Sequence, residues 1–228
     1  MDVTLIFSIM EHIGVIAFSI SGALVAIDKE MDLVGVVFLS FITSFGGGII
    51  RDLILGLPIP LFFTDSFLSL IIVCFAASVL VLVFAMVFKR TFVKDEKLLD
   101  YINNYIDAVG LGAFTVSGAK LAISVGHTTP FVPIMMGMIA CIGGGMIRDM
   151  MLNDVPFVLR KRIYALAAAA GALTYYVLWY FEAHEAAAMI FGALVTILIR
   201  VFATVFKWNM PKAINFSKLR AEMENDEK

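Results

Sequence analysis

The chain has 228 residues, of which 61% are apolar and only 16% are Asp, Glu, Lys or Arg. Soluble domains are usually about 45–50% apolar, with about a quarter of their residues charged. The mean hydropathy of +0.95 therefore excludes an ordinary soluble enzyme, a disordered protein and a disulfide scaffold. The net charge of −2 gives no support for nucleic-acid binding, which requires a basic face. We expect an integral membrane protein in a lipid bilayer.

Seven stretches are long enough to cross a bilayer as helices, which takes about 20 apolar residues. They cover residues 5–27, 33–55, 66–88, 105–125, 131–152, 162–181 and 187–206. Residues 211–228 are polar and are predicted to form a short cytoplasmic tail. Cys74 and Cys141 lie far apart within apolar stretches, so buried thiols are expected rather than a disulfide.

The positions of Lys and Arg predict the orientation of the chain, because these residues concentrate in cytoplasmic connections. Thirteen of the 17 lie in the connections and tail on one side of the predicted membrane, and none lies on the other side. The N-terminus is therefore predicted outside and the C-terminus inside. The remaining four fall within predicted spans: Arg51, Lys120, Arg148 and Arg200.

An internal duplication is the most informative pattern. Residues 14–23, GVIAFSISGA, recur as GLGAFTVSGA at 110–119, and GGGIIRD at 46–52 recurs as GGGMIRD at 143–149. Each copy holds three spans, and because three is odd the second copy must enter the membrane from the opposite side. The predicted fold is all-α, with an inverted repeat of three plus three helices (5–88 and 105–181) followed by a seventh helix (187–206). Such repeats usually place a transport site where they meet.

The duplicated glycine triplets are the first candidates for that site: Gly46, Gly47, Gly48, Gly143, Gly144 and Gly145. Glycines inside a span permit bending or local unwinding, which predicts two broken helices that face each other across a polar path. The alternative is that the triplets only allow close helix packing.

Charged residues follow each triplet, namely Arg51 with Asp52 and Arg148 with Asp149. A charge within a span costs about 2.5–3.5 kcal/mol to insert, so each needs a partner or water. Adjacent residues on a helix do not face each other, so pairing across the repeats is one expectation. These residues either line the pathway or anchor the helices structurally.

Lys120 breaks the symmetry, because its equivalent in the first copy is Leu24. It is interpreted either as a pathway charge that responds to voltage or as a side chain that extends outward to the interface. Arg200, near the cytoplasmic end of the last span, is predicted to be such an interfacial anchor.

Hydroxyl groups occupy equivalent places in spans one and four: Ser19, Ser21, Thr115 and Ser117. They either line a wet path or form hydrogen bonds between helices. His12 and His127 have no metal-ligand spacing with other residues, and no enzyme motif is present, so neither a metal, a cofactor nor an enzymatic activity is expected.

The duplicated GGGxIRD, the SGA element before each copy and the layout of the spans resemble the prokaryotic branch of the trimeric intracellular cation (TRIC) channel family. Its members are also catalogued as glycine-transporter-domain proteins. The resemblance implies a homotrimer in a prokaryotic inner (plasma) membrane, with one pore per protomer. That pore would lie between spans two and five, be kinked at the glycines, and conduct K⁺ or Na⁺. Lys120 resembles a lysine tied to voltage response in animal members.

Three classes of function therefore remain open. A cation channel is the first. A secondary transporter of glycine or a similar small solute is the second, because inverted repeats with broken helices also occur in carriers. A membrane scaffold is the third, although it leaves the repeat unexplained.

Overall fold

The computed structural model describes residues 3–64, 68–88, 96–160 and 163–208. Within these ranges seven helices are long and apolar enough to cross a membrane. They are α1 (Val3–Asp28), α2 (Leu33–Ile54), α3 (Leu68–Val87), α5 (Glu96–Ser124), α6 (Phe131–Met151), α8 (Ile163–Tyr180) and α9 (Glu185–Val205). The prediction of an all-α protein with seven spans is confirmed. The predicted tail at 211–228 lies outside the described residues.

The ends of the helices follow local chemistry. Asp32 caps α2, because its carboxylate accepts a hydrogen bond from the Gly35 amide at 2.7 Å. Left-handed residues follow other helices, including Gly126 (φ 98°) after α5 and Asn153 (φ 56°) after α6. Two short helices were not predicted: the 3₁₀ turn η1 (Leu61–Phe63) and α7 (Phe157–Arg160). Both are too short to give a periodic apolar pattern.

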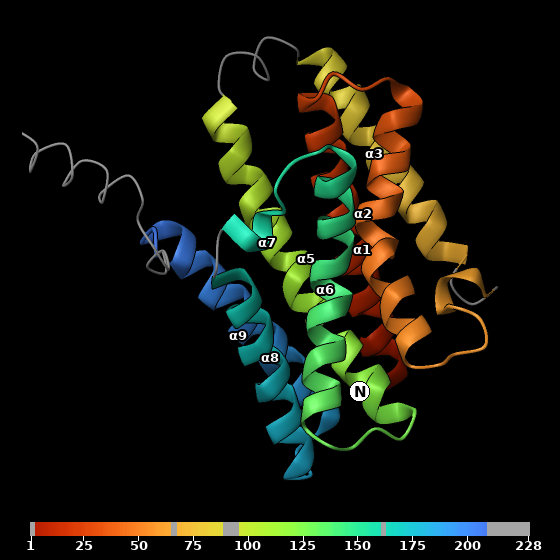
Figure 1. Cartoon of the computed structure of the whole chain (residues 1–228), viewed down its shortest axis with the longest axis vertical. Helices are drawn as coiled ribbons and strands as arrows, with labels where there is room; N and C mark the ends of the chain where they lie inside the picture. Colours follow the sequence, from red (N-terminus) through yellow and green to blue (C-terminus); the bar gives the residue numbers. More distant parts are fainter. Residues whose placement is uncertain (1–2, 65–67, 89–95, 161–162, 209–228) are drawn as a thin grey trace, which may run out of the picture.

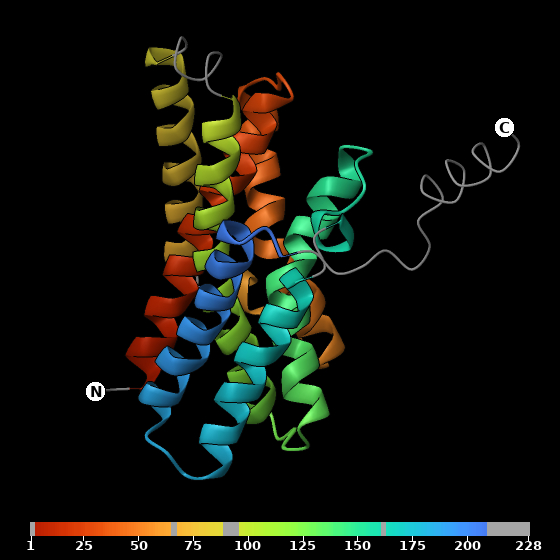
Figure 2. The same ribbon diagram turned by 90° about the vertical axis from the view of Figure 1, so that its left-hand side faces the viewer.

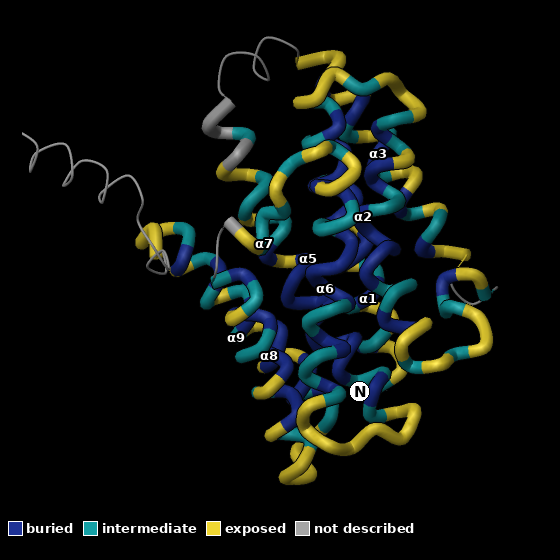
Figure 3. The backbone as a smooth tube through the Cα atoms, viewed as in Figure 1, coloured by how far each residue is buried: buried dark blue, intermediate teal, exposed yellow. Residues whose placement is uncertain are grey.

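Four helices form the centre of the bundle. α1 packs on α2 and α5, and α6 packs on α2 and α5, while α3 covers α1 and α2, and α8 with α9 covers α5 and α6 (Figures 1 and 2). Buried residues gather in the middle of the bundle, and exposed ones lie on the outer faces and in the connections (Figure 3). The connection after α2 lies at the lower end of the bundle in Figure 1, and the connection after α6 at its upper end.

Two phenylalanines from equivalent positions of the duplication hold α1 against α5. The rings of Phe18 and Phe114 meet edge to face, with centroids 5.2 Å apart. Each ring also covers a glycine of the opposite helix, since a Cβ atom on Gly14 would meet Phe114 and one on Gly110 would meet Phe18. The small residues that begin the duplicated segments are therefore required for packing between these two helices.

The glycine triplets lie where α2 crosses α6. Gly47 rests against the backbone of Ala140, and Gly144 rests against the backbone of Thr43. The helical hydrogen bonding of α2 and α6 continues through both triplets, so the expected break in these helices is wrong. The glycines instead let the two backbones touch, a contact that any side chain would prevent.

Adjacent glycines provide a matched test of this contact. A Cβ on Gly144 would collide with the Thr43 carbonyl, whereas the nearest atom to a Cβ on Gly145 is Arg148 Nη2 at 3.8 Å. We expect Gly144→Ala to lower the free energy of unfolding by about 1–3 kcal/mol through overpacking. Gly145→Ala should leave it unchanged or raise it slightly, because alanine favours helix. Thermal unfolding of both variants in detergent checks this, and equal melting temperatures would contradict the proposed contact.

Candidate functional site

A buried ion pair ends α2. Arg51 binds Asp52 through Nε and Nη2, each 2.8 Å from Asp52 Oδ1, and both side chains are at most 4% exposed. The second carboxylate oxygen of Asp52 accepts a hydrogen bond from the Leu61 amide at 2.8 Å, which ties the start of η1 to the helix end. The sequence left open whether Arg51 pairs with its neighbour or across the repeats, and the structure shows the pair with its neighbour. The long arginine side chain folds back along the helix surface to reach the next residue.

The same arrangement ends α6. Arg148 Nε and Nη2 each lie 2.8 Å from Asp149 Oδ1, and Asp149 Oδ2 accepts a hydrogen bond from the Phe157 amide at 2.7 Å. Phe157 is the first residue of α7, so each short helix is held by the aspartate before it. The two GGGxIRD motifs therefore form two equivalent local structures, one at the end of each helix.

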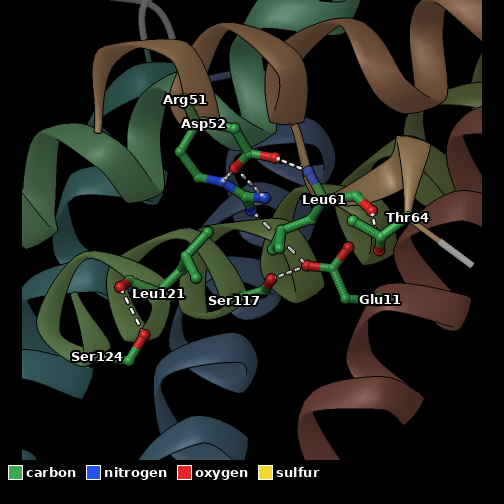
Figure 4. Close-up of polar contacts among 8 residues, drawn as sticks. All are labelled: Glu11, Arg51, Asp52, Leu61, Thr64, Ser117, Leu121 and Ser124. Carbon is green, nitrogen blue, oxygen red and sulfur yellow. Dashed lines mark hydrogen bonds and ion pairs between the residues drawn. The ribbon is translucent and has the colours of Figure 1, made fainter. Parts of the chain in front are cut away.

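Glu11 of α1 joins the first ion pair. Its Oε1 lies 3.7 Å from Arg51 Nη1 and accepts a hydrogen bond from the Ser117 hydroxyl of α5. Figure 4 shows the Arg51 guanidinium between the Asp52 and Glu11 carboxylates, with Leu61 beside it and Ser117 below. Glu11 is only 6% exposed. This group of residues brings together two carboxyl groups and one guanidinium.

The predicted hydroxyl residues are all buried, and three of the four bridge helices. Ser19 and Ser44 share a hydrogen bond of 2.9 Å between α1 and α2, and Ser21 accepts one from Arg148 Nη1 at 3.1 Å. Ser117 of the second copy thus contacts Glu11 beside the first ion pair, and Ser21 of the first copy contacts Arg148 of the second ion pair. Thr115 bonds within its own helix, to the Leu111 carbonyl.

Each ion pair borders a cavity. The first cavity has room for water-sized molecules in about 20 Å³, and its polar lining is Glu11, Ser44, Arg51 and Asp52, together with Gly48. The second has about 30 Å³ of such room and is lined by Asn103, Asp107, Gly145, Arg148, Asp149 and Tyr164, among others. Glu11 and Asp107 are 96 residues apart, and the arginines and aspartates of the two motifs are 97 apart. The two cavities are therefore built from equivalent positions of the duplication.

Lys120 lies away from both cavities. Its Nζ atom is 3.0 Å from Glu185 Oε1 at the first turn of α9 and 5.6 Å from the centre of the Phe7 ring. Its side chain is 18% exposed. Lys120 therefore connects α5 to α9 and α1, and the structure does not bring it together with the Arg–Asp pairs.

Arg200 is not the interfacial anchor that the sequence predicted. It is 2% exposed, and its guanidinium lies 4.8 Å from the Tyr164 ring centre and 5.5 Å from that of Phe157. The buried face of α9 includes Ala193, Thr196, Arg200 and Ala203, which are spaced at helical intervals. Arg200 falls on this inward stripe, and so it points at the aromatic wall of the second cavity rather than at the membrane surface.

Comparison with known proteins decides the family. The family model described as "Glycine transporter" matches residues 8–86 and 104–180, which is more than half of the chain. A solved structure of a prokaryotic TRIC channel in KCl is 33% identical, covers 91% of this chain and all of its own, and superposes with a TM-score of 0.80. The chain belongs to the prokaryotic TRIC family. The predicted resemblance is confirmed.

Further relatives of this TRIC family member agree. The TRIC orthologue from Rhodobacter sphaeroides is 32% identical, with 89% of this chain and 98% of that chain covered and a TM-score of 0.79. The UPF0126 membrane protein YvgT of Bacillus subtilis is 34% identical over 90% of this chain and 95% of its own length. The UPF0126 inner membrane protein YadS of Escherichia coli is 32% identical over 88% and 92%. Together with seven apolar helices, these relatives identify a multi-pass membrane protein.

Glu11 and Asp107 are the site residues that sequence reasoning missed. Both are acidic residues inside apolar helices at equivalent positions of the duplication, ten residues before Ser21 and Ser117. Their equivalent positions could have identified them from the sequence, although the duplicated segments 14–23 and 110–119 begin after both residues. Among the described residues, no group of three or more His, Cys, Asp or Glu side chains is placed to hold a metal ion.

The Arg51–Asp52 pair offers a test of buried against exposed charge. Asp52→Asn should lower the free energy of unfolding by about 3–5 kcal/mol or prevent folding, because it leaves a buried guanidinium without its full counter-charge. Asp154→Asn is the matched control, since Asp154 binds Lys29 at 3.1 Å with both side chains more than 40% exposed. That change should cost less than about 1 kcal/mol. Comparable melting temperatures for the two variants would refute the structural role of the buried pair.

Proposed function

We propose that this TRIC family member is a channel for monovalent cations, K⁺ or Na⁺, with its pathway between α2 and α6. The observation that carries the proposal is the pair of equivalent cavities, each bordered by a buried Arg–Asp pair and one further carboxylate. Solved relatives at 32–39% identity are described as TRIC cation channels, which supports the same function.

The carboxylates account for a preference for cations. In each cavity the arginine is bound to the adjacent aspartate, so that Glu11 or Asp107 remains as the excess negative charge. A carboxylate in a cleft with low-dielectric walls concentrates its field and raises the local concentration of cations. The arginines would otherwise repel cations, but the adjacent aspartates neutralise them.

The glycine triplets separate the two cavities and are proposed as the hinge of the pathway. Gly48 borders the first cavity and Gly145 the second, while the backbone contacts of Gly47 and Gly144 lie between α2 and α6. Cation passage then requires these helices to bend or move apart at the crossing. Because glycines have no side chains, α2 and α6 meet at the triplets through backbone contacts alone. The two helices can therefore separate there without pulling interdigitated side chains apart.

The proposal includes the finer arrangement that the sequence predicted. The chain would be an inverted repeat with its N-terminus outside and its C-terminus inside a prokaryotic inner membrane, and would assemble as a homotrimer with one pore per protomer. The clustering of Lys and Arg in connections on one side and the equivalent positions of the two cavities support this arrangement. Glycine transport is the alternative, tested by the uptake of labelled glycine into proteoliposomes that contain the purified protein.

Glu11 is predicted to govern cation entry. Glu11→Gln keeps the size of the side chain but removes the excess negative charge of the first cavity, so single-channel K⁺ conductance should fall by about twofold or more. Glu182→Gln, in the exposed connection between α8 and α9, is the control and should conduct as the wild type does. Planar-bilayer recording measures both. Full K⁺ conductance in Glu11→Gln, in protein that unfolds at the wild-type temperature, would remove Glu11 from the pathway.

Lys120 is predicted to affect voltage response more than folding. Lys120→Ala removes a cation that is bound to Glu185, and a charge that crosses the full membrane is worth about 2.3 kcal/mol per 100 mV. We expect altered voltage dependence of opening, with Lys120→Arg retaining the wild-type behaviour. Open probability measured against voltage in planar bilayers tests this. An unchanged voltage dependence in Lys120→Ala would make the residue a structural link between α5 and α9.

A further inference from the structure

The two cavities match in their duplicated residues but differ in one charge from outside the duplication. Each holds one arginine and two carboxylates from equivalent positions: Glu11, Arg51 and Asp52 in the first, and Asp107, Arg148 and Asp149 in the second. Each set has a net charge of −1. Arg200 belongs to α9, which follows the duplicated segments, so the first cavity has no equivalent residue.

Arg200 is held against the wall of the second cavity. Tyr164 and Phe157 line that cavity, and the Arg200 guanidinium lies over both rings. Within the described part of the chain, its Nε and Nη2 atoms have no hydrogen-bond partner. A buried guanidinium with unpaired donors is costly unless an opposite charge is near.

Asp107 is the opposite charge. Among the described residues its Oδ2 atom has no hydrogen-bond partner, while its carboxyl group interacts with Tyr164 and with two cations, Arg148 and Arg200. Arg148 is already bound to Asp149 at 2.8 Å. Arg148 therefore faces two carboxylates, Asp107 and Asp149, and Arg200 supplies a second positive charge near Asp107, through space rather than through a direct bridge.

Among the described residues that line the first cavity, Arg51 is the one guanidinium, and it binds both Glu11 and Asp52. His12, the next residue along α1, also acts on Glu11 but does not line the cavity, and its Nδ1 atom lies 2.7 Å from the Ser8 carbonyl oxygen. With Arg200 counted, the net charges are −1 in the first cavity and zero in the second.

We propose that Arg200 makes the cation pathway electrostatically asymmetric, so that each channel conducts more readily when cations enter from the first cavity than from the second. This inference rests on the proposed channel function and adds to it a residue that sets the direction of easier flow. Cations accumulate in a cavity with excess negative charge, and a neutral cavity does not supply them as readily.

Neutralising Arg200 and Asp107, singly and together, tests the proposal, because it predicts an order of current ratios among the variants. Arg200→Gln gives the second cavity a charge of −1, Asp107→Asn gives it +1, and the double variant returns it to zero. The measurement is the ratio of the larger to the smaller single-channel K⁺ current at equal and opposite voltages, which is the same for either orientation of the channel in the bilayer. We expect a wild-type ratio of about two, a ratio near one for Arg200→Gln and a larger ratio for Asp107→Asn.

The double variant Asp107→Asn/Arg200→Gln is the decisive arm, because a purely structural role of Arg200 would not restore the wild-type ratio when a second buried group is also changed. Arg200→Lys, which keeps the charge, should rectify as the wild type does. The proposal is overturned if Arg200→Gln rectifies like the wild type, if Arg200→Lys behaves like Arg200→Gln, or if the double variant fails to return to the wild-type ratio. Absence of any wild-type current would instead overturn the channel function, and this inference with it.

Discussion

Contact between the backbones of α2 and α6 is the constraint on which the rest of the structure depends. Gly47 lies on the Ala140 backbone and Gly144 on that of Thr43, so the two helices approach more closely than side chains would allow. This approach places the following turn of each helix, with its Arg–Asp pair, beside the centre of the bundle rather than on its surface. Wider separation would leave the pairs facing lipid, where charge is costly.

The buried charges follow from that placement. Arg51 and Arg148 each bind the next residue, and each aspartate uses its second oxygen to hold the amide of a short helix, at Leu61 or Phe157. Removal of one partner from such a group would leave the other charged and buried, so these groups are maintained as units. Glu11 is left over in the first cavity and supplies the negative potential that the proposed cation pathway needs, whereas Asp107 in the second cavity faces Arg200 as well as Arg148.

The sequence predicted the number and positions of the spans, but it did not predict which charged side chains bind one another. Long apolar stretches placed the seven spans within a few residues, because hydrocarbon thickness sets helix length. The duplicated motif also indicated that Arg51 and Arg148 would have equivalent surroundings. The pairing of Arg51 with Asp52 could not be decided from the sequence, because spacing along a helix describes where side chains start and not where a long one ends. Arg200 was missed because position near a helix end says nothing about which face it occupies.

The glycine triplets allowed two predictions, a break in the helix or close packing of helices, since glycine permits both. Sequence cannot choose between them, because the choice depends on what lies opposite. Here a second helix with its own triplet lies opposite, and α2 and α6 remain continuous. Glu11 shows the same limit, as its partners Arg51 and Ser117 come from two other helices.

The most direct test of the account is the current carried by the purified wild-type protein in a planar bilayer that separates unequal KCl concentrations. A cation pathway lined by Glu11 and Asp107 predicts single-channel currents that reverse close to the K⁺ equilibrium potential, without glycine. No current at any voltage, together with saturable uptake of labelled glycine by proteoliposomes from the same preparation, would contradict it.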